Sequence, residues 1–255
     1  MRFERLLDVL GFISIEKEIT IVSYSTELQN EWNAAYNRGG NLCFYPHEEI
    51  VRFINRYVRK RISIKDFANL MNLQKDEWEN FASLDLGCGI GRHVVFLDEF
   101  GLNPYGIDLS DDAINMGKSW VKSIGKDYLE DHLLVGSVTE LPFEDGFFNI
   151  CVSAGVLDSM PRNIAETGLN EVYRVLKSGG LMYLDLIMDD NRGNVDEIVQ
   201  GGYEENTVQS YFSTDKIYEF IGNKADVIDF QIITHKNLDD KVREKRAHLI
   251  IRKNS

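Results

Sequence analysis

Three glycines, Gly87, Gly89 and Gly91, follow a short apolar stretch that contains Asp85. Alternate glycines let a chain turn sharply and bring bare backbone against a ligand. A helix-like pattern begins directly after them, and the free N–H groups at the start of a helix attract a negatively charged group. This combination predicts a site for a nucleotide-type cofactor.

A second acid, Asp108, stands nineteen residues beyond Gly89, at the end of another apolar run. A carboxylate at the tip of the second strand can accept hydrogen bonds from both hydroxyls of a ribose. The glycine spacing G-x-G-x-G differs from the dinucleotide fingerprint G-x-G-x-x-G. In addition, Asp85 would repel a pyrophosphate and attract an ammonium group. The pattern therefore disfavours a nicotinamide-dependent oxidoreductase.

The stretch from Asp85 to Gly91, together with Asp108, resembles the first motif and the ribose-binding acid of class I S-adenosylmethionine-dependent methyltransferases. The stretches 136–143 and 171–180 resemble further motifs of that family, and the resemblance covers roughly residues 32–253. It implies an α/β fold with a Rossmann-like, seven-stranded, mostly parallel sheet and helices on both faces. It also implies S-adenosyl-L-methionine as the cofactor.

The resemblance assigns parts of this cofactor to particular residues. The methionine part is expected against the glycine loop, with Asp85 near its amino group, while Asp108 holds the ribose. Ser137 stands where the family often has an aspartate beside the adenine, and a hydroxyl makes a weaker hydrogen bond than a carboxylate. The residues expected to bind the cofactor are Asp85, Gly87, Cys88, Gly89, Gly91, Arg92, Asp108, Leu109, Ser137, Val138, Ser153 and Ala154.

Methyl transfer from a sulfonium depends mainly on alignment and on the exclusion of water. A general base is needed only where the nucleophile arrives protonated, as an alcohol does. Two residues are candidates: Asp158 is either a base, a helix-capping acid or a solvent-facing acid, and His93 is either a base or a helix residue packed beside the sheet. No metal site is expected, because acids that follow a strand, such as Asp189 and Asp190, are commonly turn formers.

Alternating strand and helix patterns place these residues at one edge of a sheet, where open α/β sheets bind ligands. Helices are expected after Gly91, Ser110, Pro161 and Ser213. The last two strands follow each other without a helix, which predicts an antiparallel pair at the sheet edge. The expected strands are 83–86, 103–108, 132–136, 147–154, 181–187, 225–234 and 246–252.

An N-terminal segment, residues 1–80, is expected to precede the cofactor-binding domain, residues 81–255. The pattern predicts a helix over 3–10, a short hairpin or a pair of edge strands over 13–21, and mainly helix over 26–80, with a turn before a helix at 47–60. In families of this kind such a segment covers the cofactor and shapes the substrate pocket. The aromatic and basic residues that are either lid or core here are Trp32, Tyr36, Tyr45 and Arg52.

The composition narrows the choice of partner. The 255 residues carry a formal net charge of −13, which disfavours nucleic acid and anionic lipid as partners. Three scattered cysteines and a charged N-terminus favour a cytoplasmic protein with reduced thiols, and no apolar run is long enough to span a membrane. A monomer and a homodimer both remain open.

These observations predict a methyltransferase that acts on a small metabolite, on oxygen rather than nitrogen, with glycan- or nucleotide-linked metabolites as one substrate class. The alternative is a catalytically inactive subunit that binds S-adenosylmethionine and regulates a partner.

Overall fold

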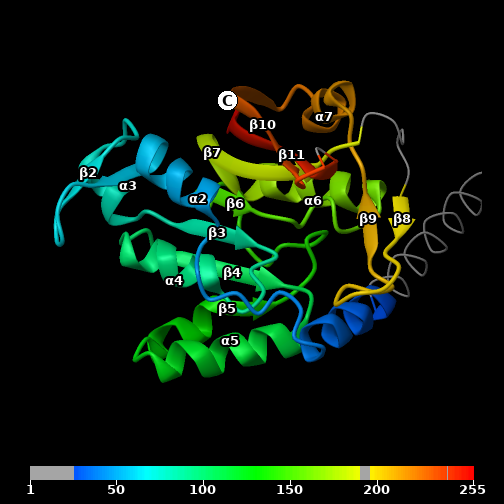
Figure 1. Ribbon diagram of the computed structural model, residues 1–255. Helices are drawn as coiled ribbons and strands as arrows, with labels where there is room; N and C mark the ends of the chain where they lie inside the picture. Colours follow the sequence, from blue (N-terminus) through cyan, green and yellow to red (C-terminus); the bar gives the residue numbers. More distant parts are fainter. Residues whose placement is uncertain (1–25, 190–195, 240) are drawn as a thin grey trace, which may run out of the picture.

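Figure 1 shows the computed structural model, which describes residues 26–189, 196–239 and 241–255. The helix and hairpin expected within residues 3–21, and Asp190, lie outside the described residues. Within the described ranges, no helix combines the length and the apolar character that a membrane span requires.

A seven-stranded sheet forms the centre of the fold, in the order β10-β11-β7-β6-β3-β4-β5. Strand β11 runs in the opposite direction to the other six strands, so the expected mostly parallel sheet with an antiparallel pair at its edge is confirmed. The strands of this sheet are β3 (Ser83–Leu86), β4 (Pro104–Asp108), β5 (Leu133–Val135), β6 (Phe148–Ser153), β7 (Leu176–Ile187), β10 (Ala225–Lys236) and β11 (Val242–Lys253).

Helices cover both faces of this sheet, and two small hairpins lie outside it (Figure 1). The first described helix spans residues 26–37. The others are α2 (Glu48–Phe53), which continues as the π-helix η1 (Ile54–Val58), α3 (Lys75–Glu79), α4 (Arg92–Glu99), α5 (Asp111–Ser123), the 3₁₀ helix η2 (Asp127–His132), α6 (Arg162–Val175) and α7 (Thr214–Ile221). The hairpins pair β1 (Arg59–Arg61) with β2 (Phe67–Asn69) and β8 (Asp196–Ile198) with β9 (Val208–Ser210).

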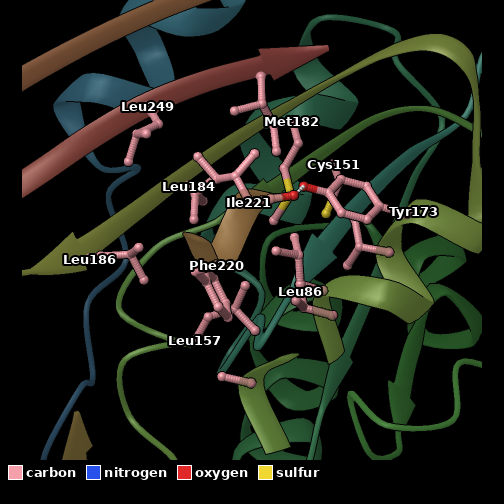
Figure 2. Packing of buried hydrophobic residues seen from close by; sticks show 14 of the residues in the cluster. Leu86, Cys151, Leu157, Tyr173, Met182, Leu184, Leu186, Phe220, Ile221 and Leu249 are labelled. Atoms are coloured by element: carbon pink, nitrogen blue, oxygen red, sulfur yellow. Dashed lines mark hydrogen bonds between the residues drawn. The ribbon is translucent and has the colours of Figure 1, made fainter. Parts of the chain in front are cut away.

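Separate apolar clusters bury the two faces. On one face α6 and α7 pack against the central strands, and Figure 2 shows Tyr173 of α6 donating its hydroxyl hydrogen bond to the Ile221 carbonyl of α7, at 3.1 Å. On the other face α2, η1 and α4 pack against β6, β7 and β11. The start of α2 is thereby held against the strands at the antiparallel edge.

The helix expected over 47–60 is wrong at its end, because the chain turns into the β1–β2 hairpin at Arg59. There Arg59 donates to the Phe100 carbonyl at 2.8 Å, and Arg61 donates to the Glu99 carbonyl at 3.1 Å. Both guanidinium groups also stack on the Phe67 ring. These arginines therefore stabilise the end of α4, where cations are favourable.

Candidate active site

The glycine loop begins where β3 ends, and it turns through three left-handed residues. Gly87, Gly89 and Gly91 have φ values of +62°, +55° and +84°, a region that side chains disfavour. A Cβ atom at Gly87 would lie 2.4 Å from the Val156 side chain. Gly91 caps the N-terminus of α4. Glycine is thus required at this loop, which presents bare backbone at the carboxyl ends of the strands.

Asp108, at the end of β4, is tied to this loop through backbone hydrogen bonds. The Gly89 N–H donates to Asp108 Oδ2 at 2.7 Å, and the Ser110 N–H donates to Oδ1 at 2.8 Å. Burial raises the pKa of Asp108 to about 6, although both N–H groups act in the opposite direction. The carboxylate is therefore fixed in place and only weakly stabilised in its charged form.

A cavity of about 1020 Å³ lies over the loop and continues to the antiparallel edge of the sheet. Five of the residues expected at the site do not line it: Asp85, Gly91, Ser153, Tyr45 and Asp158. The expected residues that line it are Trp32, Tyr36, Arg52, Gly87, Cys88, Gly89, Arg92, His93, Asp108, Leu109, Ser137, Val138 and Ala154.

The helix over residues 26–37 closes the cavity above the glycine loop. The Tyr36 hydroxyl lies 2.4 Å from the point that a Cβ atom at Gly89 would occupy. Gln29 donates to the Leu109 carbonyl at 2.9 Å, and the Ser110 hydroxyl donates to Asn33 Oδ1 at 2.6 Å. These contacts hold the helix over the two loops and place Tyr36 on the cavity wall, as expected for a lid residue.

Asp85 lies beneath the loop, buried with His93. The His93 Nδ1 atom is 3.2 Å from Asp85 Oδ1, while His93 Nε2 accepts a hydrogen bond from the His47 backbone N–H at 3.2 Å. The second carboxylate oxygen, Asp85 Oδ2, is buried without a hydrogen-bond partner in the described part of the chain. The remaining acceptor of Asp85 suits a cationic group held at the loop. His93 has its Nε2 lone pair occupied, so this geometry favours a positioning role over the expected base.

Asp158 lies behind the cavity wall and is fully buried. Its Oδ2 atom pairs with the Arg246 guanidinium at 2.6 Å and accepts the Ile187 N–H at 2.7 Å. Burial raises the pKa of Asp158 to about 6 against the effect of Arg246. In this arrangement Asp158 supports the cavity wall, and the geometry does not place it as a base in contact with a substrate.

The remaining lid candidates differ in position. Tyr45 is 80% exposed and lies outside the cavity. Arg52 lines the cavity, but its guanidinium pairs with Glu48 at 2.6 Å and with Glu49 at 3.4 Å.

The opposite end of the cavity contains residues that the sequence analysis did not single out as site residues. We call this the histidine end and define it by His47, Asp185, Glu244, Arg246 and His248, all of which line the cavity. Arg246 donates to Asp185 at 3.1 Å and to Glu244 at 3.4 Å, and Asp185 also accepts the Gly155 N–H at 2.6 Å. The alternation of 244, 246 and 248 along β11 places them on one face, a signal that could have been used.

Comparison with known proteins agrees with this architecture. Residues 84–184, which include the glycine loop and Asp108, match the family described as "Methyltransferase domain". The match agrees with the expected family over this part of the chain.

Individual relatives give the same class. A demethylmenaquinone methyltransferase of Bacillus pumilus is 35% identical over 116 residues, 44% of this chain and 46% of the relative. A sterol 4-C-methyltransferase of Caenorhabditis elegans is 24% identical over 159 residues, 58% of this chain and 42% of the relative. The chain therefore spans less than half the length of these curated relatives.

The crystal structure of a S-adenosylmethionine-dependent methyltransferase from Methanosarcina mazei superimposes with a TM-score of 0.57 at 19% identity. That match covers 72% of this chain and 99% of the other. It confirms the class I methyltransferase fold.

Proposed function

We propose that the protein transfers a methyl group from S-adenosylmethionine to a small molecule. The observation that supports this most directly is the shared cavity, which is lined both by the glycine loop with Asp108 and by the residues of the histidine end. A cavity of about 1020 Å³ is at the upper limit of ordinary ligand pockets, consistent with a cofactor and a second molecule together.

The residues present fit this cofactor. Gly87 and Gly89 line the cavity with bare backbone, and Asp108 offers acceptors for ribose hydroxyls. The unpartnered Asp85 Oδ2 suits an amino group. When bound, S-adenosylmethionine supplies a methyl group on an activated sulfonium. The protein orients the acceptor and excludes water, and the helix over 26–37 contributes to both by covering the loop.

We propose oxygen rather than nitrogen as the methylated atom. The histidine end contains N–H donors on Arg246 and on its two imidazoles, which suit an oxygen-bearing molecule better than an ammonium group. Apolar side chains also line the cavity, among them Met160, Ile164, Ile187 and Ile233. They favour an acceptor less polar than the glycan- or nucleotide-linked metabolites expected from the sequence.

A second candidate function is cofactor binding without turnover, in a regulatory subunit. The observation that favours it is the state of the two expected bases: Nε2 of His93 already accepts a backbone hydrogen bond, and Asp158 is buried in an ion pair. Transfer to an already deprotonated acceptor needs no base, so this observation leaves both candidates testable.

Two measurements test the proposal in sequence. Calorimetric titration with S-adenosylhomocysteine should show binding, while NADH, the control, should not bind. Formation of S-adenosylhomocysteine is then measured with apolar ketones, phenols and sugar nucleotides as acceptors. Absence of S-adenosylhomocysteine binding would overturn both candidates, whereas binding without turnover on any acceptor would favour the regulatory subunit.

A further inference from the structure

Two imidazole rings face each other at the histidine end. His47 caps the N-terminus of α2, and His248 lies on β11, directly opposite Asp185 of β7. The ring centroids are 5.9 Å apart with an angle of 26° between the planes, and both residues line the cavity. Two histidines brought together from distant segments at a cavity wall need a physical explanation.

The hydrogen bonds on the protein side determine which nitrogen of each ring carries the proton. The Glu49 backbone N–H donates to His47 Nδ1 at 3.3 Å. The Tyr183 hydroxyl is 2.8 Å from His248 Nδ1, and burial raises the pKa of Tyr183, so the hydroxyl keeps its proton. With the hydroxyl as donor to Nδ1, its hydrogen-bond partner among the described residues, His248 is the Nε2–H tautomer. In the neutral form both rings then carry their proton on Nε2.

Neither Nε2 atom has a hydrogen-bond partner among the residues that the structure describes. Neither belongs to the fully buried polar atoms that lack a partner, so each keeps some accessible surface. Both residues line the cavity, and an Nε2–H group that faces it can donate to a molecule inside. The end of the cavity away from the glycine loop thus offers a pair of adjacent N–H donors.

The surroundings favour neutral imidazoles and a neutral acceptor. Burial lowers the pKa of both His47 and His248. The charged or titratable groups that face the pair are Asp185, Glu49, Glu244, Arg246, Arg92 and His93. Arg246 pairs with the carboxylates of Asp158, Asp185 and Glu244, and with Glu49 the carboxylates outnumber the two cations, Arg246 and Arg92. An anion would therefore meet a surplus of negative charge here.

The adjoining cavity wall is apolar. Ile187 and Ile233 lie on either side of Arg246 in the sheet, and Met160 and Ile164 also line the cavity. We propose that His47 and His248 together bind a neutral carbonyl oxygen of the methyl acceptor, whose apolar body lies against this wall. The pair is a specificity-determining donor set and does not act as a base. This inference rests on the proposed function, because it assigns the second molecule of the shared cavity.

Three naphthalenes of similar shape test the assignment on the full chain saturated with S-adenosylhomocysteine: 2-acetylnaphthalene, 2-naphthoate and 2-ethylnaphthalene. Their affinities are measured by the change in naphthalene fluorescence. The ketone should bind about tenfold more tightly than the hydrocarbon, since a hydrogen bond to a buried donor contributes roughly that much. Equal affinities would overturn the proposal, and tightest binding of the carboxylate would overturn the assignment of a neutral acceptor.

Variants assign the effect to the two rings. H47S keeps a good N-cap residue and removes the ring, H248F keeps a ring and removes the donor, and H248Q restores a donor. H47S and H248F should each abolish the preference for the ketone, and H248Q should recover part of it. H132A is the matched control, because His132 stacks on Tyr105 at the start of β4 and does not line the cavity. An unchanged ketone preference in both H47S and H248F would overturn the inference.

Titration with S-adenosylhomocysteine accompanies every variant and separates this inference from the proposed function. Retained S-adenosylhomocysteine affinity shows that the variant is folded, and loss of the ketone preference then supports the histidine pair. If the unmodified chain fails to bind S-adenosylhomocysteine, the proposed function fails, and so does the histidine assignment that rests on it. If S-adenosylhomocysteine binds and the ketone shows no preference, only the histidine assignment fails.

Discussion

The two ends of the cavity are built in different ways. The glycine-loop end is made by local sequence: Gly87, Gly89 and Gly91 form one turn, and Asp108 ends the next strand. The histidine end joins the start of α2 to strands β7 and β11, and the contact between Asp185 and Arg246 spans 61 positions. One end is therefore determined by backbone conformation, and the other depends on how the whole sheet assembles.

The two ends also differ in how they hold charge. At the glycine-loop end, Asp108 is fixed by two backbone N–H groups, which no side-chain substitution elsewhere removes. At the histidine end, one guanidinium pairs with Asp158, Asp185 and Glu244 together. A single substitution at the histidine end should thus mainly lower the stability of the fold. A single substitution at the glycine-loop end should mainly lower the affinity for the ligand.

The largest effect is expected from R246M. Removing the guanidinium leaves buried Asp158 and Asp185 without their cation, and breaking such a buried network costs about 3–5 kcal/mol. Urea unfolding measures this loss. R252M, on the same strand but exposed, is the control and should change stability by less than about 0.5 kcal/mol. Equal stability of the two variants would contradict the difference between the two ends.

The difference also explains what the sequence could predict. The fold class, all seven strands and the lining role of Gly87, Gly89 and Asp108 follow from local patterns, since a strand ending in glycines has few alternatives. For Tyr36 the sequence leaves lid and core open, and the structure places it both on the cavity wall and in an apolar cluster with Ile90 and Ala113.

The errors concern residues whose surroundings are set by distant segments. Asp158 was a plausible loop acid, but its partner Arg246 follows 88 positions later. Arg59 lies in the helix expected over 47–60, yet it stacks on Phe67 and donates to the Phe100 carbonyl at the end of α4, which holds it in a hairpin. The alternation along β11 places His248 on one face with Glu244 and Arg246, but nothing local pairs it with His47, because only the packing of α2 against the sheet brings their rings together.

At the glycine-loop end, G89V should lower the affinity for S-adenosylhomocysteine by about a hundredfold or more. A Cβ atom at Gly89 would overlap the Tyr36 hydroxyl and would be strained at a φ of +55°. Calorimetry measures the affinity. G125V is the control for strain alone, because Gly125 has a φ of +73° with no atom within 4 Å of its Cβ position. Comparable losses of affinity in both variants would show that the clash with Tyr36 is irrelevant.

D108A should lower the affinity for S-adenosylhomocysteine by about tenfold to a hundredfold, the range expected for the loss of hydrogen bonds to a charged group. The same titration compares it with D131A, an exposed acid at the end of η2. Unchanged affinity in D108A would remove this carboxylate from the ribose site.

The smallest effect is a pH dependence that only the glycine-loop end should show. Burial raises the pKa of Asp108 to about 6, so the carboxyl of the free protein is largely ionised at pH 7 and largely protonated at pH 5. Ribose hydroxyls donate to the ionised form, hence binding favours loss of the proton and lowers this pKa. The affinity for S-adenosylhomocysteine should therefore fall by up to about tenfold between pH 7 and pH 5, with proton release on binding near pH 6. Titrations in buffers of different ionisation enthalpy measure that release, and D108N should lose both signals, because an amide does not titrate. If D108N kept the pH dependence, the titrating group would instead be Asp158, the other acid with a pKa of about 6, and the effect would belong to the histidine end.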